Sequence, residues 1–204
     1  MIGIRLVLAA CGAALLAGCA LTRPPEVQTV LRLSVRFEPQ EPRAASPSVS
    51  VAPTQARGLT AERRYAYVER DQPAVVRQAA SLFWEEPPPV VVERALVDGL
   101  GARFAQVAGP QSLVQADERV TARVERFEEV TGAGLPTQAV VAFEATVVGT
   151  GGDRFGRTRR YCSAAPIASA EPSARATAFE AALSRDVEQL VQDLSTGASS
   201  TPSC

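Results

Sequence analysis

The stretch ERVTARVERFEEV, residues 118–130, sets the architecture of the chain because apolar and polar residues alternate along it. The apolar positions share one side of an extended chain: Val120, Ala122 and Val124. This period of two indicates a half-buried β-strand. After the glycine-containing loop at 131–137, the stretch QAVVAFEATVVG at 138–149 alternates in the same way. Two such runs joined by a short loop predict an antiparallel hairpin.

The C-terminal side of this hairpin adds an edge strand and a helix. After the turn TGGD, the stretch RFGRTRRYC at 154–162 is typical of an arginine-rich edge strand. The stretch from about 172 to 196 places its apolar residues on one helical face: Phe179, Leu183, Val187, Leu190, Val191 and Leu194. That spacing predicts an amphipathic helix.

The N-terminal side contains three further alternating stretches. VQTVLRLSVRF at 27–37, SVSVAPTQA at 48–56 and RRYAYVER at 63–70 each predict a strand. Residues 71–89 lack a clean period and are expected to be irregular.

A second helix is expected to begin at the proline run 87–89, because proline is favoured in the first helical turn. From Pro89 onward, large apolar residues recur every four positions: Val92, Leu96, Leu100 and Phe104. We expect this helix to end near 108–110. The order of elements predicts an α+β fold, with a mostly antiparallel sheet and two amphipathic helices packed on one face.

The N-terminus has the layout of a bacterial export signal. Arg5 precedes an apolar run too short to span a bilayer, which needs roughly 20 residues. Leu16-Ala17-Gly18-Cys19 then resembles the lipobox, in which the cysteine is acylated and becomes the first mature residue. The alternative is ordinary secretion with an incidental cysteine. We therefore divide the chain into a signal peptide (1–18), a lipidated tether (19–26), a domain (27–196) and a polar tail (197–204).

Lipidation of Cys19 implies a membrane-anchored protein that faces an aqueous, oxidising space. Two or three fatty-acyl chains such as palmitate hold a protein on a membrane almost permanently, at roughly 0.8 kcal/mol per buried methylene. Residue two of the mature chain is Ala20 rather than aspartate. By resemblance to Gram-negative lipoproteins, this favours the periplasmic face of the outer membrane.

Composition excludes several classes of protein. The chain contains no His, Lys or Asn, so it has no Ser-His-Asp arrangement, imidazole metal ligand, Schiff-base lysine or Walker lysine. No metal or cofactor is expected. The mature chain has 20 basic and 22 acidic residues. It therefore lacks the excess positive charge that attracts nucleic acid. The carboxylates at 85–86, 125, 128–129 and 153 are interpreted as solvated charge rather than as the pair that a hydrolase needs.

Two cysteines remain in the mature domain besides Cys19. The helix over about 172–196 is roughly 37 Å long, and the segments 162–172 and 196–204 can together span roughly 59 Å. A Cys162–Cys204 disulfide is therefore geometrically possible in an oxidising compartment. The alternative is a buried Cys162 and a free thiol in the tail.

The candidate contacts for a partner or for lipid head groups are one tryptophan and one arginine cluster. Trp84 is either a buried anchor, the interpretation we favour, or an exposed aromatic lip that a partner grips. The cluster Arg154, Arg157, Arg159 and Arg160 either protects a sheet edge by charge, which we favour, or contacts anionic head groups or an acidic partner.

In their order, these features resemble the ABC-type transport auxiliary lipoproteins (PqiC-like). The resemblance covers most of 27–195 and rests on the lipobox and a series of quoted motifs: VSVAP at 49–53, RYAYV at 64–68, FWEEPPP at 83–89, VTARVERFEE at 120–129 and ATAFEAALSRDVEQL at 176–190. It implies a non-enzymatic lipoprotein of the bacterial envelope that assists an MCE-domain protein and its ABC transporter. The implied cargo is phospholipid or another hydrophobic molecule.

Two other functions stay open from sequence. One is a structural or assembly lipoprotein that supports an outer-membrane machine without handling lipid. The other is a secreted hydrolase, which the carboxylate pattern does not favour.

Overall fold

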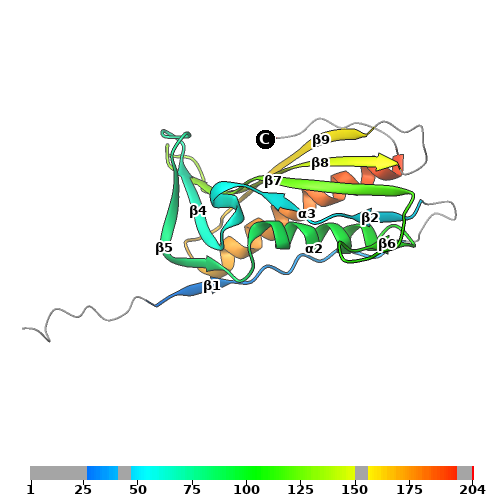
Figure 1. Cartoon of the computed structure of the whole chain (residues 1–204). Coiled ribbons are helices and arrows are strands. Elements are labelled where there is room, and N and C mark those ends of the chain that lie inside the picture. The colour runs from blue at the N-terminus through cyan, green and yellow to red at the C-terminus, as the bar shows by residue number, and fades with distance from the viewer. Residues whose placement is uncertain (1–26, 41–46, 150–155, 197–203) are drawn as a thin grey trace, which may run out of the picture.

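The computed structural model describes residues 27–40, 47–149, 156–196 and 204. The hairpin expected over residues 118–149 lies at its centre. β7 (Glu118–Thr131) pairs antiparallel with β8 (Gln138–Gly149), and β8 pairs antiparallel with β9 (Arg157–Pro166). These three long strands lie side by side in Figure 1. The predicted antiparallel hairpin and the edge strand that follows it are confirmed.

The other edge of β7 is lined by short strands that run parallel to it. β2 (Val49–Val51), β3 (Gln55–Ala56) and β4 (Arg64–Glu69) follow one another along β7, each in parallel register. The sheet is therefore mixed, and the expectation of a mostly antiparallel sheet is wrong. Parallel neighbours need a long crossover connection, which α2 (Pro88–Gly101) and its flanks supply between β4 and β7.

Three more strands bring the sheet to nine strands within the described residues. β5 (Val76–Trp84) pairs antiparallel with β4, and β1 (Thr29–Leu31) pairs parallel with the last residues of β5. β6 (Val107–Ala108) pairs parallel with β2. A 3₁₀ turn, η2 (Gly58–Ala61), precedes β4.

β5 corrects the expectation that residues 71–89 are irregular. The sequence VRQAASLFW does not alternate, because the register between β4 and β5 shifts between Arg64 and Ala66. A bulge of this kind breaks the period of two while leaving the strand paired.

The expected strand at 27–37 is shorter than its alternation suggests. Only Thr29–Leu31 joins the sheet, and the chain then crosses the helix layer. Leu33 is still buried, the Ser34 N–H donates to Glu180 Oε1 at 2.7 Å, and the Gln40 N–H donates to the Ala102 carbonyl at 2.7 Å. The alternation here therefore reflects packing against helices.

Both helices lie on one face of the sheet and contact each other, as expected (Figure 1). α3 (Pro172–Thr196) has the expected bounds. α2 ends at Gly101 rather than near 108–110, although Phe104 beyond its end is buried. The regular four-residue spacing therefore continued past the end of the helix.

Gly99 allows the close approach of the two helices. A Cβ atom at this position would lie far inside van der Waals contact of Val187 Cγ1 on α3, and 3.3 Å from Phe37 Cζ. A Cβ at Gly101 would meet nothing within 4 Å. Gly99 lowers the helix propensity of α2, and in return it permits tight packing against α3.

The outer face of the sheet carries a second, small apolar cluster. Alternate residues of β8 and β9 point away from the helices. Val140, Ala142 and Cys162 form this cluster on the outer face, whereas their neighbours Phe143 and Tyr161 belong to the main core.

Candidate functional site

Trp84 is a core residue. Its side chain is 1% exposed, and its ring centroid lies 4.8 Å from Phe179, 5.0 Å from Tyr65 and 5.2 Å from Phe127. The two edge-to-face contacts among these are a favoured aromatic geometry. Trp84 therefore anchors β5 to α3, as the favoured interpretation expected, and its ring is not accessible to a partner.

The arginine cluster is divided between the two faces of β9. Arg159 points to the helix face, where its Nη1 donates to Asp193 Oδ2 at 2.6 Å. Arg160 points outward and its Nε donates to Glu125 Oε2 at 2.7 Å. Arg157 is exposed, and Arg154 lies outside the described residues. The four arginines therefore do not form one contact surface within the described part of the chain, because alternation separates neighbours along a strand.

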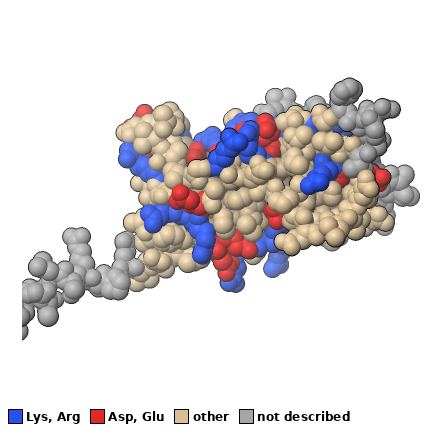
Figure 2. All heavy atoms as spheres, in the orientation of Figure 1, with Lys and Arg blue, Asp and Glu red and all other residues tan. Residues whose placement is uncertain are grey.

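Charges of both signs are interspersed over the surface. Figure 2 shows blue and red side chains next to each other across the middle of one face. The pairs Arg32–Glu85 and Arg123–Glu144 are examples, with N–O distances of 2.6 and 3.1 Å. Such exposed pairs contribute little to stability, in general about 0–1 kcal/mol each.

Most of the carboxylates weighed as catalytic candidates are ion-paired. Glu85, Glu86 and Glu125 pair with arginines at the surface. Glu128 and Glu129 are only 7% and 8% exposed, so their interpretation as solvated charge is wrong. Asp153 lies outside the described residues. Within the described ranges, no three His, Cys, Asp or Glu residues gather where they could hold a metal ion.

Two buried Tyr–carboxylate–Arg clusters fix α3 to the sheet at its two ends. At the first end, Glu129 Oε2 accepts hydrogen bonds from Tyr65 Oη at 2.6 Å and from Arg175 Nε at 2.8 Å. Burial, together with the hydrogen bond to Glu129, raises the pKa of Tyr65. The phenol therefore stays neutral and donates.

The second cluster repeats this chemistry near the other end of α3. Asp193 Oδ2 accepts from Tyr161 Oη at 3.0 Å and from Arg159 Nη1 at 2.6 Å. Burial and the neighbouring Asp193 carboxylate raise the pKa of Tyr161. Buried polar groups with their partners in place specify one arrangement of helix and sheet.

Asp186 lies between these clusters and is less well satisfied. It is 2% exposed, and its Oδ2 has no hydrogen-bond partner among the described residues. Burial raises the pKa of the Asp186 carboxyl to about 7, against the opposing effect of Ser163, which hydrogen-bonds to it. A buried carboxylate with a free oxygen favours its protonated form.

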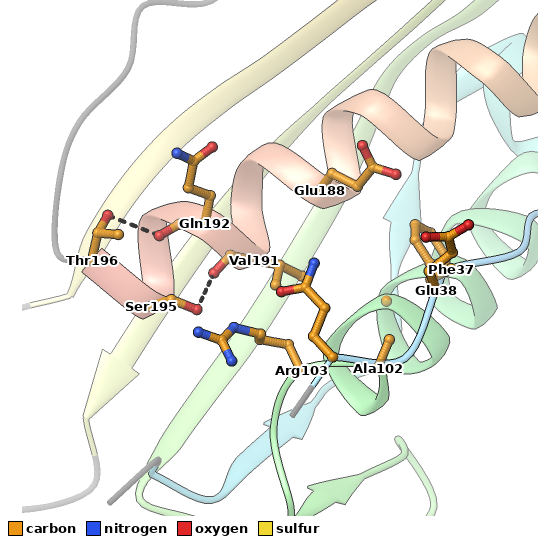
Figure 3. A pocket seen from close by; sticks show the side chains of 11 residues that line it. Phe37, Glu38, Ala102, Arg103, Glu188, Val191, Gln192, Ser195 and Thr196 are labelled. Carbon is orange, nitrogen blue, oxygen red and sulfur yellow. Dashed lines mark hydrogen bonds between the residues drawn. The ribbon is translucent and has the colours of Figure 1, made fainter. Parts of the chain in front are cut away.

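A groove opens between the C-terminal ends of α2 and α3 (Figure 3). Its volume is about 610 Å³, within the range of ligand pockets, which is about 300–1,000 Å³. One wall is the chain at 37–40, and the others are the two helix ends. The lining is both apolar and polar: Phe37, Gly99, Ala102 and Val191 supply apolar surface, and Glu38, Gln40, Arg103, Glu188, Gln192, Ser195 and Thr196 are polar.

The polar groups of the groove are not arranged for nucleophilic chemistry. The Ser195 hydroxyl donates to the Val191 carbonyl at 2.8 Å, and the Thr196 hydroxyl donates to the Gln192 carbonyl at 2.9 Å. Both hydroxyls are therefore engaged with their own helix, as the dashed lines in Figure 3 show. The mixed lining suits contact with an amphipathic molecule or with the side chains of a partner.

The two cysteines in the described part of the chain form a disulfide. Cys162 and Cys204 are bonded, with their Cα atoms 5.4 Å apart. Cys19 lies outside the described residues, so its lipidation stays a prediction. No helix in the described ranges is long and apolar enough to cross a membrane.

Of these residues, the sequence analysis named Glu129 and Arg159, but it did not single out Tyr65, Arg175, Tyr161, Asp186 or Asp193. A signal exists for the two aspartates. Asp186 and Asp193 lie three residues after Leu183 and Leu190 on the apolar stripe of α3. A carboxylate on the buried face of a helix needs a partner or a proton. The partners of these two aspartates come from β9, and the sequence of α3 alone does not identify them.

Comparison with known proteins gives a family and a fold. Residues 32–193 match the family model of the ABC-type transport auxiliary lipoprotein component. The crystal structure of protein XCC0632 from Xanthomonas campestris, of the DUF330 family, is similar with a TM-score of 0.68 and 24% identity. The similarity covers 83% of this chain and 96% of that one.

A second crystal structure, of an uncharacterized protein, has a TM-score of 0.67 at 12% identity and covers 83% of this chain and 99% of that one. No curated protein matches the chain. The two structural similarities establish the fold, and the family match spans most of the described domain. The chain therefore belongs to the family of the ABC-type transport auxiliary lipoprotein component.

Proposed function

We propose that this lipoprotein is a non-enzymatic auxiliary component of an MCE-type ABC transport system that moves lipid across the bacterial envelope. The observation that carries the proposal is the family match over residues 32–193. An anchor at Cys19 would hold the domain on the periplasmic face of the outer membrane. There it would contact an MCE-domain protein and, through it, the ABC transporter.

The use of the buried polar groups supports a role without catalysis. The carboxylates of Glu129 and Asp193 each bind a tyrosine and an arginine that belong to the joint between α3 and the sheet. Catalytic groups are generally found in a cleft with access to substrate. Glu129 borders a pocket of about 290 Å³, but its Oε2 is already occupied by Tyr65 and Arg175. The Oδ2 of Asp193 is likewise occupied by Tyr161 and Arg159.

The groove between α2 and α3 is the surface that we assign to contact with the transport partners. Its lining combines the apolar Phe37 and Val191 with the charged Glu38 and Glu188. Protein interfaces likewise contain both apolar and polar surface. Phospholipid is the second occupant that its amphipathic lining suits.

The role is tested by deletion and complementation. Loss of the protein should increase the permeability of the outer membrane to large antibiotics and detergents, and the wild-type chain should restore the barrier. Cys19→Ser should fail to restore it while the protein accumulates to a normal level, because the domain would no longer be anchored.

A permeability barrier that stays intact on deletion, in a strain without a second member of the family, would contradict a role in lipid transport. Full complementation by Cys19→Ser would contradict the anchor while leaving the transport role standing. A defect in the assembly of outer-membrane proteins, with normal lipid distribution, would instead support the structural alternative.

A further inference from the structure

Two neighbouring turns expose apolar residues where β4 and β7 end. The segment 71–76 leads from β4 into β5, and the segment 132–136 joins β7 to β8; we call them the paired turns. Every residue of both turns is exposed, and only Asp71 among them is ionisable. The first turn contains the apolar run Pro-Ala-Val-Val at 73–76. A run of four exposed apolar residues is unfavourable in a soluble protein unless it serves a function.

Arg70 holds the two turns side by side. β4 and β7 are parallel neighbours and end at the same level. The Arg70 guanidinium donates to the carbonyls of Gly132 at 3.0 Å, Leu135 at 3.4 Å and Pro136 at 2.7 Å. Its other side-chain contact within the described ranges is the amide oxygen of Gln138 at 3.4 Å. No carboxylate of the described residues therefore neutralises the positive charge of Arg70.

The turn 132–136 has a fixed and strained conformation. Ala133 has a φ of 58°, between Gly132 at 90° and Gly134 at 67°. A residue with a Cβ atom adopts such a φ only at an energetic cost, and strained positions persist where the surrounding structure fixes them, often at functional surfaces. The turn directs Leu135 outward, and this side chain is 60% exposed.

The composition of the paired turns suits a lipid surface better than a protein partner. Their large apolar side chains are Val75, Val76 and Leu135, at 42%, 41% and 60% exposure. Hot spots of protein interfaces are rich in Trp, Tyr and Arg, and Val and Leu are under-represented in them. Binding to a membrane interface instead scales with the apolar area buried and with the attraction of cations to anionic lipid. The aliphatic side chains and Arg70 supply these two contributions.

The N-terminal end of the domain lies at the same end of the molecule. Figure 1 shows β1 and the turn between β4 and β5 at one end, with β5 running between them. From Leu82, which pairs with β1, the strand reaches Val76 within at most about 20 Å. The eight residues from Cys19 to Val27 can span about 29 Å. Val27 and Val30 are themselves 84% and 52% exposed. A bilayer that holds Cys19 is therefore within reach of the paired turns.

We propose that the paired turns are a second membrane contact, which places Val75, Val76 and Leu135 in the head-group region of the bilayer that holds Cys19. Arg70 lies directly behind them, where it would meet the lipid phosphates. The inference rests on the anchor at Cys19 that the proposed function includes, and not on lipid transport itself. Two contacts with the bilayer fix the orientation of the domain. The groove at the C-terminal ends of α2 and α3, at the other end of the molecule, then faces away from the membrane (Figure 1).

The test uses the intact lipoprotein in vesicles of phosphatidylethanolamine with a minor share of phosphatidylglycerol. Val75→Cys or Leu135→Cys carries the polarity-sensitive dye NBD, and Cys162 and Cys204 escape labelling because they form a disulfide. Leu113→Cys is the matched control, because Leu113 is fully exposed and precedes β7 at the end of the strand opposite to the turn 132–136. We expect nitroxide-labelled lipids to quench the dye at the paired turns several-fold more strongly than at the control.

A charge in the first turn should weaken this contact. In the Leu135→Cys protein, Val75→Glu should reduce the quenching several-fold, whereas Leu113→Glu should leave it unchanged. Both substitutions lie in exposed loops, so the urea midpoint of each protein should not move. A Val75→Glu protein that keeps its quenching would overturn the proposal.

The remaining outcomes separate this inference from the proposed function. Quenching at Val75 and Leu135 no stronger than at Leu113, in a protein that floats with the vesicles, would overturn the membrane contact alone and leave the paired turns to a protein partner. A protein that does not float with the vesicles would overturn the anchor and this inference together. Strong quenching in a lipoprotein whose deletion leaves the permeability barrier intact would support the membrane contact and contradict the transport role.

Discussion

Replacement of Asp186 by asparagine should make the protein more stable at alkaline pH. Asp186 is buried at the joint between α3 and β9, and its Oδ2 lacks a hydrogen-bond partner in the described structure. In the native state the carboxyl is favoured in its protonated form. An asparagine side chain at this position would keep nearly the same shape and would carry no charge at any pH.

The size and sign of the effect follow from the pKa of this carboxyl. Burial raises its pKa from 3.8 to about 7. Each pKa unit corresponds to about 1.4 kcal/mol. The free energy of unfolding therefore falls by at most about 4 kcal/mol when the pH rises through this window. Between these two values the native state binds more protons than the unfolded state, and stability therefore falls as the pH increases. The loss is complete above about pH 7.

The assay is urea unfolding of the full chain carrying Cys19→Ser, so that it is not lipidated, between about pH 4 and pH 8.5. With a slope of about 2 kcal/mol per molar urea, Asp186→Asn should raise the midpoint at pH 8 by up to about 2 M and leave it nearly unchanged at pH 4. Glu188→Gln, an exposed carboxylate on the same helix, is the matched control and should show no such difference. A midpoint for Asp186→Asn below that of the parent protein at pH 8 would refute the reasoning, since it would mean that the charged carboxylate is stabilising.

Three further substitutions test the packing and the polar joint by the same unfolding assay. Phe179→Ala removes a fully buried ring that contacts Trp84 and Phe127, and should cost about 3–5 kcal/mol; a loss below about 1 kcal/mol would contradict the assignment of this core. Gly99→Ala should destabilise by about 1 kcal/mol, because overpacking against Val187 costs about 1–3 kcal/mol and exceeds the gain in helix propensity, whereas Gly101→Ala should be neutral or stabilising. Equal effects of the two glycine substitutions would exclude the close approach as the cause. Asp193→Asn should cost about 3 kcal/mol, because it leaves the partly buried Arg159 without its carboxylate. Glu85→Gln, at the exposed pair with Arg32, should cost less than about 1 kcal/mol. Similar losses in both would argue against a special role for the cluster around Asp193.

Local patterns predicted the elements whose period is unbroken. The alternation in 118–130 and 138–149 and the apolar stripe of α3 correspond to β7, β8 and α3 with nearly the expected bounds. The alternation at 27–37 overstated a strand, because burial against helices produces the same pattern as burial in a sheet. β5 was missed because its register shift breaks the alternation.

Strand direction is a non-local property, and the sequence did not specify it. β2, β3 and β4 each have only two to six residues, and nothing within them distinguishes a parallel from an antiparallel partner. The crossover through α2 decides the direction.

The direction of side chains in the candidate site was predictable from the sequence, but the contacts between different elements were not. Alternation along β9 already implies that Arg159 and Arg160 face opposite sides, so their closeness in sequence does not make them one cluster. Asp193 as the partner of Arg159 requires the contact between α3 and β9, which only the folded arrangement provides. The groove depends on where α2 ends, and the four-residue spacing placed that end too late.

Site-specific photocrosslinking in living cells tests the transport role most directly. A photoreactive residue at Gln192 in the groove, and a control at Val148 on β8, would be introduced into the intact lipoprotein, and crosslinked partners would be identified by mass spectrometry. The proposed function predicts recovery of an MCE-domain protein or its ABC transporter from Gln192 and much weaker recovery from Val148. Recovery of only outer-membrane assembly or cell-wall proteins from both positions would contradict it.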